Sequence, residues 1–299
     1  MISGALFLNP QKKVDIKKLY ARNILRIITA FLFWSAVYTF VAWYANLGIN
    51  SKLDLLTTFM KGHYHMWFLL MIAGLYIIVP AVRLITQNEK VMKYFLIISF
   101  VFTVAIPTVE TLTGALLTVY PERHWSAIND AFNYDVSMMN FTFATGHVLY
   151  FVLGYYLSQY DLTKRIRKII YLLSAAGFAL TIFLTAFISV KTGKSVETFH
   201  GYFELNVFME AVGVFVFFKY ARIYPKAKIA EKIQKISGWS FGVYLIHALI
   251  LETAHHFHFD ALSFSPVISV PVIAALIFVI STVGSVIIHK IPVLNKYIV

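Results

Sequence analysis

The chain alternates between long apolar runs and short polar connections. A helix needs roughly 17–25 apolar residues to cross the hydrocarbon core of a bilayer. Eight runs meet this length or come close to it, so we predict transmembrane helices at residues 27–47, 66–85, 92–109, 138–157, 169–190, 205–220, 239–257 and 266–289. Spanning helices satisfy their own backbone hydrogen bonds in lipid. The pattern therefore predicts an all-α polytopic membrane helix bundle, with about eight complete transmembrane helices and one domain over residues 1–299.

The connections between these runs alternate in charge. One set of connections, at residues 9–26, 83–93, 158–168, 219–235 and 289–299, holds 21 of the 26 Lys and Arg residues. The alternating set, at residues 48–65, 110–137, 191–204 and 258–265, holds the other 5. Basic loops stay in the cytoplasm. We therefore predict that the first set and the C-terminus are cytoplasmic, and that the 110–137 connection caps the outer side.

Composition supports a membrane protein and excludes several other classes. Hydrophobic residues make up 59% of the chain and charged residues 13%, too few charges to cover a water-soluble protein of this size. The net charge of +12 is spread over the short connections and not over a solvated tail, so nucleic-acid binding is not expected. The absence of cysteine excludes disulfides, thiol nucleophiles and Cys-ligated zinc.

The first residues do not resemble a signal peptide. Residues 1–8 are apolar and precede the basic stretch, whereas a signal peptide carries its positive charges first. Eight residues reach only about 12 Å as a helix, too short for a span. We interpret them as the cytoplasmic end of a helix.

Ionisable side chains inside a bilayer are costly and are functional candidates. The first candidate is His65, which follows His63 and precedes Trp67 at the outer start of the second predicted span. His65 and Tyr76 would share one helix face. An interfacial belt of His, Tyr and Trp is the alternative interpretation.

Two further candidates lie deeper in predicted spans. His247 follows Ser240 and Tyr244 on one helix face, with Glu252 further along, and histidine exchanges protons near neutral pH. Glu210 shares a face with Asn206 in the sixth span. A purely structural role, hydrogen bonding between helices, is the alternative interpretation for both residues.

No metal site is predicted, and the histidines at 255, 256 and 258 are interpreted as an interface feature. The residues alone indicate a transporter or an intramembrane enzyme.

Four ordered segments resemble the membrane-bound acyltransferase 3 family. These are His65-Met-Trp-Phe-Leu with Gly74-Leu-Tyr up to Pro80, Phe151-Val-Leu-Gly-Tyr-Tyr-Leu, Ser240-Phe-Gly-Val-Tyr-Leu-Ile-His247 with Glu252, and the stretch from Arg22 to Trp34. The resemblance covers the whole chain. It implies transfer of an acyl group, usually acetyl, from cytoplasmic acetyl-CoA to an extracytoplasmic cell-envelope carbohydrate, by a multi-pass protein of the bacterial plasma membrane.

The resemblance also implies roles for individual residues. His65, Trp67, Glu210 and His247 would have supporting catalytic roles, and Arg22 and Arg26 would bind the coenzyme A phosphates. The partners implied are acyl-CoA, the glycan acceptor and the lipid bilayer, with no permanently bound cofactor.

The sequence departs from the family pattern in two places. The family's first span, with its principal catalytic histidine, has no counterpart, so we predict that this span and most of the second are missing. Asn23 replaces the first of two family arginines, and Arg22 lies one residue away. Two alternatives to an active acyltransferase therefore stay open: a carrier or exporter of a glycan or its precursor, and an inactive chain.

Overall fold

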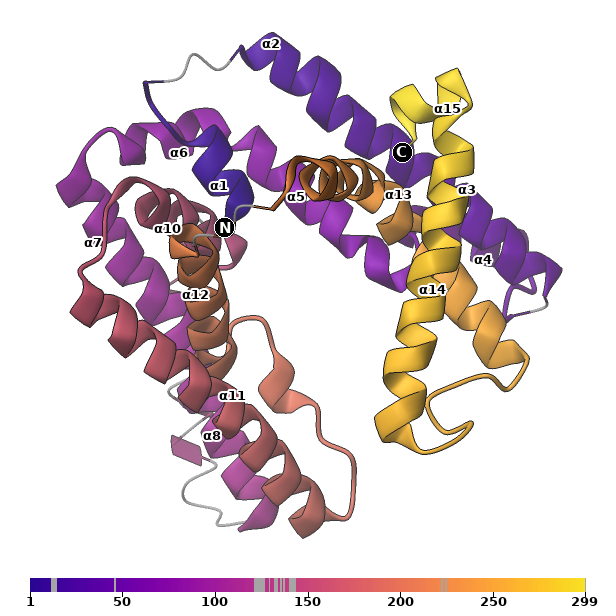
Figure 1. The fold of residues 1–299 in the computed structure, drawn as a ribbon. Helices are drawn as coiled ribbons and strands as arrows, with labels where there is room; N and C mark the ends of the chain where they lie inside the picture. Colours follow the sequence, from indigo (N-terminus) through magenta and orange to yellow (C-terminus); the bar gives the residue numbers. More distant parts are fainter. Residues whose placement is uncertain are drawn as a thin grey trace. The chain divides into compact units, whose positions relative to one another are not determined.

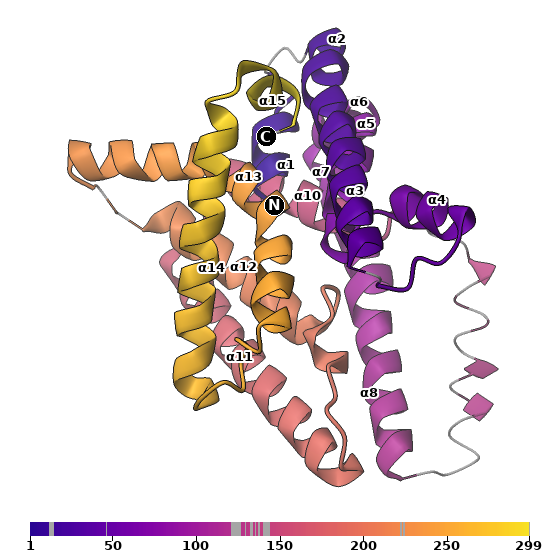
Figure 2. The ribbon, with the colours of Figure 1, turned by 90° about the vertical axis from the view of Figure 1, so that its right-hand side faces the viewer.

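The structure is a computed structural model of the chain, drawn in Figures 1 and 2. It describes residues 1–11, 15–45, 47–120, 127–128, 130–131, 134, 136, 138–139, 144–221, 223 and 225–298. The protein is 81% helical, and the described residues form no strand. The predicted all-α membrane bundle is confirmed.

Six helices are long and apolar enough to cross a membrane. They are Ile16–Tyr44, Glu89–Val119, Lys164–Thr192, Thr198–Tyr220, Ala227–His256 and Pro266–His289, and there are up to seven if the broken pair Lys52–Ile77 and Val79–Thr86 counts as one span. The broken pair covers the second predicted span. The fourth predicted span, at residues 138–157, corresponds to α10 (His147–Gln159), which has only 13 residues in the described part of the chain.

The helices extend further than the apolar runs at several ends. Helix α11 (Lys164–Thr192) begins before residue 169, because the Thr163 side chain accepts a hydrogen bond from the backbone N–H of Ile166 and caps it. Helix α13 (Ala227–His256) likewise begins before residue 239. The boundary of the predicted outer connection at residue 110 was wrong, because α8 (Ile106–Val119) continues through it. Residues 121–126 of that connection lie outside the described residues, so its capping role stays a prediction.

The chain forms two compact units. The first unit comprises Met1–Val14 and Ile78–Arg222, and the second comprises Asp15–Ile77 and Ile223–Val299. Each unit is therefore built from segments that are far apart in the sequence.

The second unit has a buried core that includes aromatic side chains of α3. Its elements are α2 (Ile16–Lys18), the π-helical turn η1 (Leu19–Ile24), α3 (Leu25–Tyr44), α4 (Lys52–Lys61), the 3₁₀ turn η2 (Tyr64–Met66), α5 (Trp67–Ile77), α13, α14 (Pro266–His289) and α15 (Pro292–Tyr297). Phe31, Trp34 and Tyr38 of α3 pack against Met66 and Leu69 and against Leu245 of α13. Figure 2 shows α13 and α14 side by side. This core fixes α3, α5 and α13 around the residues discussed below.

The first unit contains α1 (Ile2–Phe7), α6 (Val79–Thr86), α7 (Glu89–Phe100), the π-helical turn η3 (Val101–Ala105), α8, α10, α11, the 3₁₀ turn η4 (Thr198–His200) and α12 (Leu205–Tyr220). Helices α11 and α12 run side by side (Figure 1). A Cβ atom placed on Gly213 of α12 would lie 2.3 Å from the Ser174 Cβ of α11. Small residues therefore permit this close approach, as is common between membrane helices.

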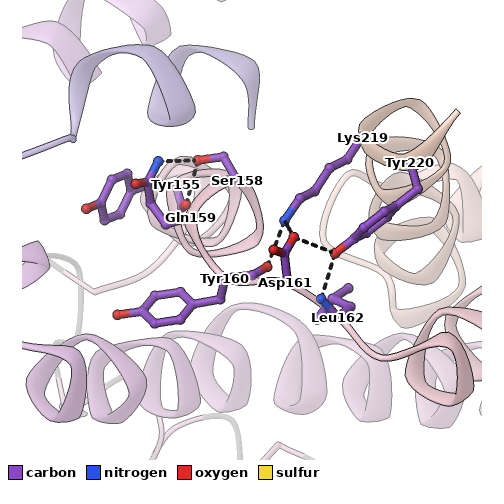
Figure 3. Close-up of polar contacts among 8 residues, drawn as sticks. All are labelled: Tyr155, Ser158, Gln159, Tyr160, Asp161, Leu162, Lys219 and Tyr220. Atoms are coloured by element: carbon purple, nitrogen blue, oxygen red, sulfur yellow. Dashed lines mark hydrogen bonds and ion pairs between the residues drawn. The ribbon is translucent and has the colours of Figure 1, made fainter. Parts of the chain in front are cut away.

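Polar contacts join the end of α12 to the connection after α10 (Figure 3). The Lys219 ammonium donates to the Tyr160 carbonyl at 2.7 Å and lies 3.4 Å from the Asp161 carboxylate. The Tyr220 hydroxyl donates to Asp161 at 3.2 Å and accepts from the Leu162 backbone N–H at 2.6 Å. These contacts satisfy backbone groups that the turn leaves without helical partners.

Candidate functional site

Two histidines meet where α4 ends and α5 begins. Gly62, with φ of +68°, ends α4, and the 3₁₀ turn η2 follows. This turn brings the Nδ1 atoms of His63 and His65 to 2.9 Å from each other. His65 is buried, with 7% of its surface exposed.

Helix α13 contributes three further polar side chains to the site. The Glu252 carboxylate lies 2.8 Å from Nε2 of His63. The Tyr244 hydroxyl donates to the His65 carbonyl at 2.5 Å, and the His247 ring lies 5.1 Å from the His65 ring. Tyr244, His247 and Glu252 of α13 therefore all contact His63 or His65.

Tyr38 of α3 packs against the ring of His63. Its ring stacks on His63 with centroids 4.2 Å apart and 18° between the planes. Its hydroxyl donates to the Leu245 carbonyl at 2.8 Å and accepts from the Leu249 N–H at 3.1 Å. Tyr38 therefore fixes the His63 ring relative to α13.

Several buried polar atoms around this site have no hydrogen-bond partner among the described residues. They are His65 Nε2 and three atoms on α3: Trp34 Nε1, Ser35 Oγ and Thr39 Oγ1. Leaving a buried donor or acceptor unpaired costs about 1–3 kcal/mol. Native proteins usually satisfy such groups with water or a ligand.

The structure brings two of the sequence-predicted residues together, His65 and His247. Trp67 starts α5 two residues after His65, with 39% of its surface exposed, and its ring packs edge-on against Phe68.

Glu210 belongs to the first unit and has different partners. Its Oε1 accepts from the Thr181 hydroxyl at 2.8 Å, and the Asn206 amide donates to the same hydroxyl at 2.6 Å. Glu204, one helical turn before Phe208, accepts from the Thr111 hydroxyl at 2.8 Å and is buried. Glu210 thus takes part in the network between α11 and α12, as the structural interpretation predicts, and a catalytic role stays a prediction.

The two predicted donor-binding arginines lie at the start of the long helix Ile16–Tyr44. Arg22 is exposed in the turn η1, and Arg26 is half-buried one helical turn later. The Arg26 guanidinium lies 5.6 Å from the centre of the Phe241 ring of α13. Both arginines belong to the second unit, as do the histidines.

Within the described part of the chain, no three His, Asp or Glu side chains converge as metal ligands would. Among the histidines at the end of α13, His255 lies 3.3 Å from Asp260 and its side chain is largely exposed. It forms a His–carboxylate pair at the surface of the second unit.

Comparison with protein-family models matches residues 1–290 to the acyltransferase domain of the acyltransferase 3 family. The chain belongs to this acyltransferase family. It is a multi-pass membrane acyltransferase, which transfers groups other than amino-acyl groups. Neither the curated proteins nor the solved structures give a significant match.

His63 and Glu252 were named from the sequence beside the candidate residues of this acyltransferase, but neither was given a role and their pairing was not predicted. Glu252 follows His247 by five residues and lies on the same helix, and His63 precedes His65 by two. The signal available was that Glu252 belongs to one segment that resembles the family and that His63 lies two residues before another. What the sequence lacked was the turn at Gly62, which directs the His63 ring toward α13.

Proposed function

We propose that this acyltransferase moves an acyl group, most simply acetyl, from acyl-CoA at the cytoplasmic face to a hydroxyl of a cell-envelope glycan outside the plasma membrane. The observation that carries the proposal is the line of contacts from the half-exposed Glu252 through His63 to the buried His65, whose Nε2 has no hydrogen-bond partner among the described residues. A hydroxyl is a poor nucleophile until a base removes its proton.

The polar atoms of α3 support a hydroxylated acceptor. A sugar offers both donors and acceptors, which suits the indole N–H of Trp34 and the hydroxyls of Ser35 and Thr39. These groups are buried in the same unit as His65. The predicted topology places the start of the second span on the outer side, where an envelope glycan is found.

The basic residues of the helix Ile16–Tyr44 support a polyanionic donor. Lys17, Lys18 and Arg22 are exposed at its first turns, which the charge pattern places in the cytoplasm. Clustered positive charge raises the local concentration of an anion such as coenzyme A. The donor and acceptor would then approach from opposite sides of the membrane.

The test uses radiolabelled acetyl-CoA with membrane vesicles of both orientations, because the donor does not cross the bilayer. Inside-out vesicles should incorporate base-labile label into glycan, and right-side-out vesicles should not. His65→Ala should abolish incorporation, and the exposed His255→Ala should not change it. Glycan that crosses the membrane without gaining an ester would support the carrier alternative and contradict this proposal.

A further inference from the structure

Two cations lie over the ring of Tyr220, the last residue of α12. The Arg167 guanidinium of α11 is 4.3 Å from the ring centre, and the Lys219 ammonium is 5.0 Å from it. The Tyr220 hydroxyl donates to Asp161 and accepts from the Leu162 N–H, and these two hydrogen bonds fix the ring (Figure 3). An aromatic face attracts a guanidinium without occupying its N–H donors. The ring therefore holds Arg167 in place and leaves its donors to other partners.

The two cations differ in those partners. The Lys219 ammonium donates to the Tyr160 carbonyl and lies 3.4 Å from the Asp161 carboxylate. The Nε atom of Arg167 is buried and has no hydrogen-bond partner in the described part of the chain, and no described carboxylate forms a salt bridge with this residue. A buried donor without an acceptor is unfavourable. The planar fork of a guanidinium matches two oxygens of a phosphate, so Arg167 is suited to an anion that the described residues do not supply.

Three further cations flank Arg167 in the first turns of α11. Lys164, Arg165 and Lys168 are exposed, and no carboxylate among the described residues forms a salt bridge with any of them. We call these four residues the α11 cation cluster. The charge pattern predicts that this end of α11 is cytoplasmic. The cytoplasmic leaflet of a membrane carries anionic phospholipids, which attract basic residues at its surface.

The surface of α11 becomes apolar one helical turn beyond the cluster. Leu172 lies four residues after Lys168 on the same helix face, and Leu173 adjoins it. Both leucines are exposed, at 61% and 47% of their surface. Four residues advance a helix by about 6 Å, close to the depth of about 5–8 Å of the headgroup region on one side of a bilayer. A molecule with a phosphate at one end and apolar chains behind it fits both parts of this surface, whereas inorganic phosphate would use only the first.

We infer that the α11 cation cluster binds the phosphate of an anionic phospholipid of the cytoplasmic leaflet, whose acyl chains lie along Leu172 and Leu173. Arg167 is the anchor, because Tyr220 holds its guanidinium and its Nε lacks an acceptor among the described residues. The other three cations contribute through their charge. Because Arg167 of α11 lies over Tyr220 of α12, the bound lipid also stabilises the packing of these two helices. The inference does not depend on acyl transfer.

Native mass spectrometry of the purified full chain in detergent micelles tests this inference, because it counts each bound lipid. Phosphatidylglycerol and phosphatidylcholine with identical acyl chains are added separately, since they differ in net charge and not in their apolar part. Each Lys or Arg near an anionic membrane surface contributes about fivefold to affinity, so the first phosphatidylglycerol should bind at least about fivefold more tightly than phosphatidylcholine. Equal dissociation constants for the two lipids would overturn the inference.

Three variants locate the lipid on the cluster. Arg167→Gln should weaken phosphatidylglycerol binding by about fivefold or more and leave phosphatidylcholine binding unchanged. Lys168→Gln should weaken it by about fivefold, and because Lys168 is exposed this variant tests the cluster even if Arg167→Gln does not fold. Lys191→Gln is the matched control, since it removes the same charge from an exposed position at the other end of α11 and should change neither affinity. Wild-type affinity for phosphatidylglycerol in Lys168→Gln, or in a folded Arg167→Gln, would contradict the assignment.

Competition decides the source of the phosphate. Inorganic phosphate and coenzyme A carry phosphate groups without the two acyl chains, so neither should displace phosphatidylglycerol when present at the same concentration as the lipid. Displacement by either would overturn the assignment to a lipid and indicate a soluble phosphate ligand. Arg167→Lys keeps the charge and loses the planar fork, so its affinity should fall between those of the wild type and Arg167→Gln. Wild-type affinity in Arg167→Lys would overturn the role of the guanidinium as the anchor.

Discussion

The imidazole rings of His63 and His65 face each other through their Nδ1 atoms, 2.9 Å apart, although only one residue separates them in the chain. The 3₁₀ turn at residues Tyr64–Met66 makes this possible, since an α-helix would direct the two side chains to different faces. Substituting His63 by Phe retains a ring that stacks on Tyr38 but removes both nitrogens.

His63→Phe should therefore lower kcat by about 10²- to 10⁴-fold, the usual contribution of general acid–base catalysis, with KM within a few-fold of the wild-type value. The comparison is steady-state kinetics of His63→Phe and His255→Phe in the vesicle assay. If both variants kept wild-type kcat, His63 would have no part in the reaction.

Removing the hydroxyl of Tyr38 should destabilise the second unit. Tyr38 is 4% exposed, and its hydroxyl contacts both Leu245 and Leu249 of α13. Tyr38→Phe loses both hydrogen bonds that join α3 to α13, so the free energy of unfolding should fall by about 1–3 kcal/mol. Tyr44→Phe is the control, because Tyr44 is 78% exposed and its removal should change the value by less than about 0.5 kcal/mol. Equal values for the two variants in reversible detergent unfolding would contradict the proposed contacts.

The contact of α11 with α12 should not tolerate a methyl group at Gly213. Gly213→Ala places a Cβ 2.3 Å from Ser174, and overpacking of this kind costs about 1–3 kcal/mol. Adding Ser174→Gly should restore part of the loss, so a double-mutant cycle should show coupling between the two sites. Gly74→Ala is the control, since nothing lies within 4 Å of its added Cβ. Additive effects at Gly213 and Ser174 would show that the helices do not approach this closely.

The network around Thr181 separates two interpretations of Glu210. Thr181→Val removes the hydroxyl that joins Asn206 to Glu210, and the free energy of unfolding should fall by about 1–3 kcal/mol. Glu210→Gln retains an oxygen that accepts the Thr181 hydrogen bond, so its effect should stay within about 1 kcal/mol. A larger loss for Glu210→Gln than for Thr181→Val would show that the charge of Glu210, and not this hydrogen bond, stabilises the unit.

The sequence predicted the helices well because their signal is local. Apolar length and loop charge depend on neighbouring residues, and the fifth to eighth predicted spans all coincide with described helices. The division into two units was not foreseen, because it joins α2–α5 to α13–α15 through contacts between residues far apart in the sequence, such as Tyr38 with Leu245, 207 residues apart. Apolar periodicity contains no information on which helices pair.

Only part of the site was predicted, because only part of it has a local signal in the sequence. His65 and His247 were found because ionisable residues in apolar runs are conspicuous. The partnership of His63 with Glu252 depends on the turn at Gly62 and on the docking of α13, neither of which a motif specifies. The role of the Tyr38 hydroxyl was missed because a tyrosine within an aromatic-rich span has no distinctive pattern.

The most direct test of the account is chemical rescue of His65→Ala in the vesicle assay. Truncation at His65 removes a buried imidazole of the candidate site and leaves a space that free imidazole can occupy. The account predicts that transfer from acyl-CoA to the glycan is lost in the variant and is partly restored by imidazole, while the wild type and His255→Ala do not respond. Wild-type transfer by His65→Ala without imidazole would contradict it.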